Sequence, residues 1–243
     1  MGFYGNLVDN YTINFNIIES TIKECDIFND IINESLDFNI VNESAMDNIK
    51  RIARNIVDKI NKLLDKIKDF FKSRILDKVK QKVKEAKSKN TEKSISYDTF
   101  EYLDLIEKIM DIIDDDKKAK KIDNLNDFVN ESDYKIHISS VDEAKDFIRK
   151  YENQNDLYNY LHELENTLKE KVKYWEDIIK DNENKIKNAA NKGDELIYKF
   201  DNNRIKFDML SISQLQSVAS SLALSYIARA SRDVITISNM ISK

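Results

Sequence analysis

The stretch that decides the fold is residues 47–75, "DNIKRIARNIVDKINKLLDKIKDFFKSRI". It contains no proline and no glycine, the two residues that most often interrupt a helix. Its apolar residues recur at steps of three or four positions, which places them on one face of an α-helix. The resulting stripe consists of Ile49, Ile52, Ile56, Ile60, Leu63, Ile67 and Phe70, widened by Ala53, Val57, Leu64 and Phe71. The stretch therefore predicts a long amphipathic helix.

This helix is expected to begin near Ser44, whose hydroxyl can accept a hydrogen bond from an exposed backbone amide. Asp47 would then face the positive end of the helix dipole. Continued to about Lys89, the helix would be about 69 Å long, which exceeds the width of a compact domain of this size. Beyond Leu76 the apolar stripe thins among lysines. We therefore expect the helix of region 44–90 to protrude, bend or break.

The charge of this region contrasts with that of its neighbours. The whole chain has a net charge of −5. Residues 1–46 carry eight acids and one base, a net charge of −7, whereas residues 47–89 carry fifteen bases and six acids, a net charge of +9. The remaining residues carry −7. The sequence therefore places a basic helix between acidic segments.

The composition of the whole chain favours long helices. Its 243 residues are 41% hydrophobic, which is enough for a core, and they include no proline and only three glycines. We expect a mostly α fold, an elongated helical bundle with long amphipathic helices and a minor β element. Four regions are expected: an acidic N-terminal arm (1–43), the long basic amphipathic helix (44–90), a helical middle region with short strands (91–205) and an uncharged Ser/Ala-rich helix (206–243).

The N-terminal arm starts with an alternating pattern. Tyr11, Ile13, Phe15 and Ile17 alternate with polar residues, which is typical of a half-buried strand. A short helix over roughly 18–36 can follow, because apolar residues there can share a face. We therefore expect the arm to be extended at its start and helical after it.

The middle region contains signals for helices and for one strand. After a linker at 90–97, Asp98 and Glu101 can cap a helix that begins with "YLDLIEKIMDII". The stretch "YKIHIS" alternates like a short strand. Ser140 and Glu143 then form a capping box in front of "VDEAKDFIRKY".

A second long helix is expected from Asn155 to about Lys192, because leucines recur there at helical spacing. Gly193 can end it in the left-handed conformation that glycine adopts without strain. The next stretch, "LIYKFDNNRIKF", alternates on its way to Asn202 and Asn203. A hairpin and a kinked helix both remain open for it.

The last region contains "MLSISQLQSVASSLALSYIA" (209–228), which has no charged residue over a length that can span a membrane. Six serines and two glutamines make it more polar than a typical span, so we do not expect it to cross a bilayer. One helical face carries Ile212, Leu215, Ala219, Leu222, Tyr226 and Ala230. We expect this helix to be covered on most sides, either by its own bundle or by a neighbouring subunit.

The sequence contains no recognisable catalytic or metal-binding pattern. Cys25 is the only cysteine, and His137 and His162 are too far apart in sequence for the spacing typical of metal ligands. Glu163 and Glu165 do not form a defined pair of carboxylates. We therefore expect a protein that is not an enzyme and that uses no metal, no cofactor and no small-molecule substrate.

Three kinds of partner remain open for the basic helix. A nucleic acid would use its lysines to neutralise phosphates, and the candidates are Lys59, Lys62, Lys66 and Lys72. A membrane, the less favoured partner, would take the apolar face, with Phe70 and Phe71 inserted and the lysines at anionic headgroups. The favoured alternative is that the stripe packs in a protein core, while the lysines and arginines stay hydrated or pair with the acidic segments. Something must cover the stripe, because apolar surface left in water costs roughly 25 cal/mol per Å².

The residues expected in protein interfaces belong to the basic helix and to the uncharged C-terminal helix. They are Ile56, Ile60, Leu63, Ile67, Phe70, Phe71, Leu215, Ala219, Leu222 and Tyr226. Because both helices are long and apolar on one face, we expect the chain to associate with itself or with other proteins.

The order of these regions carries a resemblance to a family. An acidic N-terminal stretch, then "ESAMDNIKRIARNIVDKINKLLDKIKDFFKSRI", then mixed helices and a Ser/Ala-rich uncharged helix resembles in layout the virion structural proteins of tailed bacteriophages that infect low-GC bacteria. Proteins of that kind are helical, present in many copies and found in the head interior or elsewhere in the particle. "NIIES" and "IVNES" also resemble the sites that phage prohead proteases cut, which would place processing after Glu19 and Glu43.

The resemblance implies a non-enzymatic structural protein of a phage particle, assembled in the host bacterial cytoplasm with itself or with other virion proteins. Two alternatives stay open. One is a peripheral membrane or pore-associated helical protein, and the other is an internal protein that binds nucleic acid without sequence preference.

Overall fold

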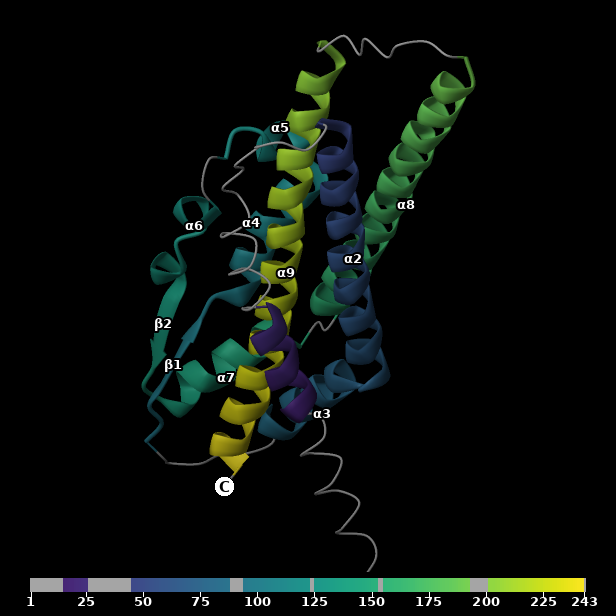
Figure 1. Cartoon of the computed structure of the whole chain (residues 1–243). Helices are drawn as coiled ribbons and strands as arrows, with labels where there is room; N and C mark the ends of the chain where they lie inside the picture. The colour runs from purple at the N-terminus through teal and green to yellow at the C-terminus, as the bar shows by residue number, and fades with distance from the viewer. Residues whose placement is uncertain are drawn as a thin grey trace, which may run out of the picture.

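The chain folds mostly into helices. The computed structural model describes residues 15–25, 45–87, 94–122, 125–152, 155–192 and 201–242. Most of these residues are helical, and the described strands form one two-stranded sheet (Figure 1). The predicted fold class, mostly α with a minor β element, is confirmed.

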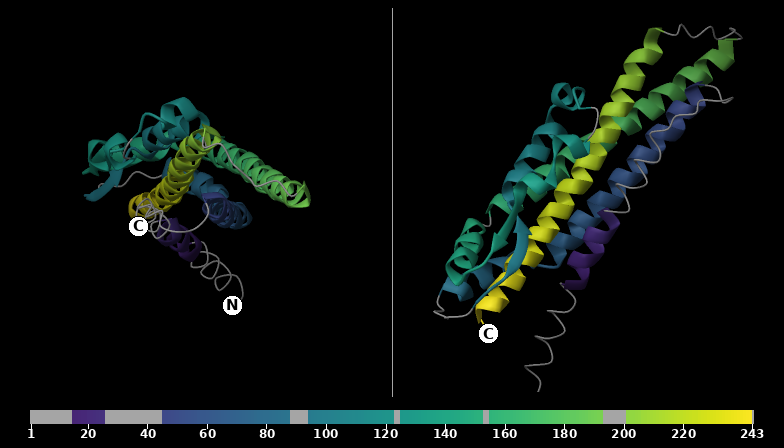
Figure 2. Two further views of the ribbon diagram at one scale, coloured as in Figure 1. Left: turned by 45° about the horizontal axis from the view of Figure 1, so that its top comes forward. Right: turned by 90° about the vertical axis from the view of Figure 1, so that its left-hand side faces the viewer.

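The longest helix, α9 (Asp201–Ser242), runs along the middle of the bundle. It packs against α2 (Ala45–Lys72) and α8 (Asn155–Lys192) on one side and against α4 (Tyr102–Asp114) on the other (Figures 1 and 2). Helix α3 (Ile75–Lys87) packs on its C-terminal part. None of the α9 side chains described between 212 and 242 is exposed. The uncharged C-terminal helix is thus covered by its own bundle, one of the two covers that the sequence left open.

Serine hydroxyls make this burial possible by bonding back to the helix. Ser217 donates to the carbonyl oxygen of Ser213 at 2.7 Å, and Ser231 donates to that of Ile227 at 2.8 Å. Each hydroxyl thereby finds an acceptor four residues earlier and needs none from a neighbouring helix. Across the described ranges, no helix is both long enough and apolar enough to cross a bilayer.

The region predicted as one long basic helix is two helices. α2 ends at Lys72 and α3 begins at Ile75, and Arg74 between them has φ of 54°, in the left-handed region. Ser73 stabilises the turn, because its hydroxyl donates to the carbonyl oxygen of Phe70 at 2.6 Å and accepts from the amide of Ile75 at 3.3 Å. Of the three outcomes expected for an overlong helix, the structure therefore shows a break.

Residues 97–100, where the sequence predicted the end of a linker and a helix cap, form a β-strand. β1 (Tyr97–Phe100) pairs in antiparallel fashion with β2 (Lys135–Ile138), the strand expected in "YKIHIS". Asp98 lies on β1 opposite His137, and its carboxylate is 2.8 Å from His137 Nδ1. The predicted role of Asp98 as a helix cap is therefore wrong, because its carboxylate contacts β2 and α4 has no side-chain capping hydrogen bond. Glu101 precedes α4 without a side-chain capping hydrogen bond.

The remaining middle elements are short, apart from α8. They are α5 (Asp116–Ala119), α6 (Leu125–Phe128), a 3₁₀ turn (Glu131–Tyr134) and α7 (Val141–Lys150). The Ser140 cap of α7 is confirmed, because the Glu143 amide donates to its hydroxyl at 3.2 Å. Helix α8 ends at Lys192 as predicted, and Gly193 lies outside the described residues.

Two segments whose sequences alternate between apolar and polar residues are helical where the structure describes them. Residues 15–25 form a helix, so the predicted strand is wrong at Phe15 and Ile17, whereas Tyr11 and Ile13 lie outside the described residues. The reason is that the buried residues after Phe15 recur at helical spacing against the bundle. For the stretch around Asn202 and Asn203, where a hairpin and a kinked helix were both open, the structure shows a helix, since α9 already includes both residues.

Candidate functional site: the buried Asp233 cluster

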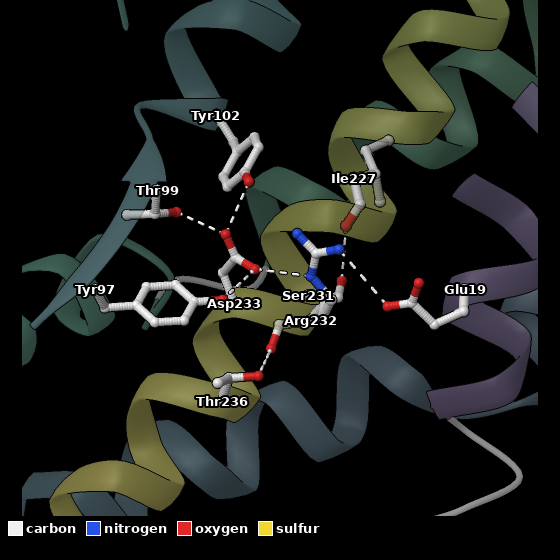
Figure 3. Close-up of polar contacts among 9 residues, drawn as sticks. All are labelled: Glu19, Tyr97, Thr99, Tyr102, Ile227, Ser231, Arg232, Asp233 and Thr236. Carbon is white, nitrogen blue, oxygen red and sulfur yellow. Dashed lines mark hydrogen bonds and ion pairs between the residues drawn. The ribbon is translucent and has the colours of Figure 1, made fainter. Parts of the chain in front are cut away.

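The most highly connected polar site of the described residues surrounds Asp233 on α9, whose side chain is 2% exposed (Figure 3). One carboxylate oxygen accepts from the Thr99 hydroxyl at 2.7 Å and the Tyr102 hydroxyl at 2.8 Å. The other accepts from the Tyr97 hydroxyl at 3.0 Å and from Nε of Arg232 at 2.9 Å. A single carboxylate thus joins β1, the first turn of α4 and α9.

The hydrogen bonds of this cluster hold structural elements together, and we call Asp233 with its four donors the brace. A carboxylate offers about four lone-pair directions, and four donors occupy them. Burial, followed by the charge of Asp233, raises the pKa of Tyr97 to about 12. The same two causes raise the pKa of Tyr102 further. Both phenols therefore stay protonated and donate at neutral pH, which leaves Asp233 no free lone pair for a substrate.

Arg232 extends the cluster to the N-terminal helix. Its guanidinium lies 3.6 Å from a carboxylate oxygen of Glu19, in addition to its bond with Asp233 (Figure 3). Burial would lower the pKa of Arg232, but the Asp233 carboxylate outweighs that effect and raises it. Because the charge of Asp233 is compensated by this guanidinium and by three hydroxyls, it can be buried at an acceptable free energy.

Two further groups of polar contacts tie α9 to the bundle at other levels. Glu131 accepts from the Tyr226 hydroxyl at 2.8 Å and from Arg229 at 3.4 Å. Nearer the start of α9, Gln216 donates to the carbonyl oxygen of Ile112 at 3.2 Å and to Asp116 at 2.8 Å, and it accepts from Lys171. The polar side chains of α9 thus position the helix against α4, α5 and α8.

No family model matches this chain, and no solved structure matches it.

The predicted interface residues lie mainly in the core of their own chain. Seven of the ten are buried there: Ile56, Ile60, Leu63, Ile67, Phe70, Ala219 and Tyr226. Phe71, Leu215 and Leu222 are half-buried and pack against the same core. The stripe of α2 is therefore covered by α8 and α9. Contact with another chain remains a prediction, and in this fold the seven buried residues have no exposed surface with which to make it.

The four predicted phosphate contacts differ in their availability. Lys66 is paired with Glu24 at 2.6 Å, and Lys72 is within 3.7 Å of Asp69. Lys62 is exposed. Partial burial of Lys59 lowers the pKa of its ammonium, and the neighbouring charge of Lys62 lowers it further. Carboxylates thus oppose at least Lys66 and Lys72 of the four lysines.

The two phenylalanines that would insert into a membrane are engaged inside the fold. Phe70 is 1% exposed. Phe71 stacks with two rings of α8, at centroid distances of 4.6 Å from His162 and 5.5 Å from Tyr158. Insertion of either ring into lipid would require α2 to separate from the bundle.

The predicted processing positions have different surroundings. Glu43 lies outside the described residues. Glu19 lies inside the helix 15–25, next to the buried Ile18. A protease would need that helix to open locally before it could cut after Glu19.

The residues of the Asp233 cluster were not found from the sequence, although a signal was present. Arg232 and Asp233 are adjacent charges in an apolar, Ser/Ala-rich helix, where any charge must find a buried partner. Cys25 is buried, and His137 and His162 each lie beside a single carboxylate. In the described part of the chain, no three His, Cys, Asp or Glu side chains gather as metal ligands.

Proposed function

We propose that this chain is a non-enzymatic structural protein of a bacteriophage particle, which assembles with itself or with other virion proteins. The observation that carries a structural role is the saturation of Asp233 by four donors from β1, α4 and α9. A buried carboxylate in a reactive site keeps a lone pair or a proton for its substrate. Here the three hydroxyl donors hold β1 and α4 against α9, and Arg232 of α9 occupies the remaining position.

The assignment to a phage particle rests on the order of the regions. An acidic start, a basic amphipathic helix and a Ser/Ala-rich C-terminal helix resemble the layout of virion structural proteins of tailed phages. A helical bundle braced at three levels by polar contacts of α9 is consistent with a protein that must persist in a particle.

Binding to nucleic acid is a second candidate, favoured by one observation. Burial and the neighbouring charge of Lys62 lower the pKa of Lys59, and burial and Lys82 do the same for Lys78. A phosphate backbone would favour the charged form of such neighbouring bases. This function would also suit a protein in the head interior, next to the packaged genome.

The proposal is tested by fractionating phage particles on a density gradient. The chain is expected in the infectious band, and it should remain there after a wash in about 1 M salt, at which screening shortens the Debye length to about 3 Å. Loss of the chain at high salt alone would favour the nucleic-acid function. Its absence from the infectious band at low salt would refute a role in the particle.

A further inference from the structure

The helix formed by residues 15–25, called the strap below, lies against α9 beside α2. Figure 1 shows it in purple along the C-terminal half of α9, and Figure 3 shows Glu19 of the strap facing Arg232. At 1.5 Å per residue it is about 16 Å long. Its buried side chains are Ile18, Thr21, Ile22 and Cys25. The strap is therefore a short amphipathic helix held by one narrow face.

Acids of the strap meet bases on two different helices. Glu19 is 3.6 Å from Arg232 of α9, and Glu24 is 2.6 Å from Lys66 of α2. The Ser221 hydroxyl of α9 also donates to the carbonyl oxygen of Cys25 at 3.3 Å. The surface under the strap is thus complementary in charge to a helix with this spacing of acids.

The α9 face under the strap is imperfectly satisfied. Ser221, Ser225 and Arg232 follow one another at steps of four and seven, so they share one face of the helix. Ser225 is fully buried, and its hydroxyl has no hydrogen-bond partner among the described residues. An unbonded buried hydroxyl costs free energy. This face of α9 therefore keeps an unbonded hydroxyl, whereas Asp233 accepts from four donors.

We propose that straps exchange between copies of this chain, so that the surface formed by Lys66, Ser221, Ser225 and Arg232 of one copy binds residues 15–25 of a second copy. The proposal rests on the proposed function, because a particle brings many copies close together. It also supplies a route to self-association, since most of the residues predicted as interfaces are buried in their own chain. Exchange of an identical element creates an interface without any new contact.

Reach and concentration set the condition for exchange. Residues 26–44 join the strap to α2, and a chain of that length can extend to roughly 60 Å. Two partners within one chain generally meet at an effective concentration of about 1 mM. Exchange is therefore expected when the copies themselves approach that concentration inside an assembly.

Chemical crosslinking between two full-length variants tests the exchange. One variant carries Glu24→Cys and the other Lys66→Cys, both with Cys25→Ala so that no native thiol remains. They are labelled with different nitrogen isotopes, mixed at about 1 mM, and treated with a short bifunctional maleimide. A single chain carrying both cysteines serves as the positive control for the contact. In the matched control, Lys135→Cys on β2 replaces Lys66→Cys, because β2 and the strap lie on opposite sides of α9 (Figures 1 and 2).

We expect a crosslinked peptide that joins position 24 of one isotope to position 66 of the other, at least tenfold above the yield with position 135. Its yield should fall on dilution, whereas the crosslink within the doubly substituted chain should not. Equal yields at positions 66 and 135 would overturn the exchange. Oligomers seen by sedimentation without this crosslink would also overturn it, while leaving the proposed assembly of virion proteins intact.

Discussion

Replacing Asp233 by alanine should destabilise the fold more than any surface substitution. The change removes the acceptor of three hydroxyls and the partner of Arg232, all in a place where the Asp233 side chain is 2% exposed. Removing one member of a buried charge pair costs about 3–5 kcal/mol, because its partners are left without compensation. In a chain of this size each kcal/mol lowers the melting temperature by roughly 2–4 °C. The expected loss is therefore about 6–20 °C.

The assay is thermal unfolding followed by circular dichroism, with an exposed ion pair as the matched control. Asp146 is bonded to Arg149 at 2.7 Å, but its side chain is 67% exposed, so Asp146→Ala should cost less than about 0.5 kcal/mol. Thr99→Val tests the mechanism, since it removes one hydroxyl that donates to Asp233 at 2.7 Å. It should cost roughly 1.5–3 kcal/mol in the native background and close to nothing together with Asp233→Ala. Equal costs in both backgrounds would refute the brace.

Three further outcomes are expected. The pKa of Tyr97 is raised to about 12, so the folded state keeps the phenol proton to a higher pH than the unfolded state does. The free energy of unfolding should therefore be at its full value below about pH 10 and fall between pH 10 and about 12. Denaturant titrations at several pH values measure this fall, which should be smaller in Tyr97→Phe. Phe70→Ala should lose about 3–5 kcal/mol, and the half-buried Phe71→Ala clearly less; equal losses in urea titrations would contradict the core position of Phe70. Arg74→Gly should gain about 0.5–1 kcal/mol, because glycine adopts φ of 54° without strain; a loss in the same titration would show that the Arg74 side chain stabilises the turn.

The fold was predictable from the sequence where the signal was local and periodic. From Ala53 to Phe70, where the structure describes the side chains of α2, the stripe predicts the buried face correctly, because a spacing of three or four positions has few structural solutions. The same holds for α8 and for the Ser140 cap of α7, whose partner lies three residues away. These elements depend on residues close to one another in the chain.

Features that depend on distant partners were not predictable in this way. The break after Lys72 requires Ser73 to bond on both sides and Arg74 to adopt a left-handed conformation that apolar periodicity does not report. Strand β1 is stabilised by β2, far along the chain. Asp233 finds its three hydroxyl donors 131 to 136 positions away, so its environment becomes visible only when the bundle is assembled.

The measurement that tests the central claim most directly is the number of copies of this chain in each phage particle. It is obtained by quantitative mass spectrometry of the infectious band, with isotope-labelled peptides of the chain and of the major capsid protein as standards. A structural protein that assembles with itself or with other virion proteins should be present in many copies, at a constant ratio to the capsid protein across the band. Less than one copy per particle, or a ratio that drifts from fraction to fraction, would contradict the account.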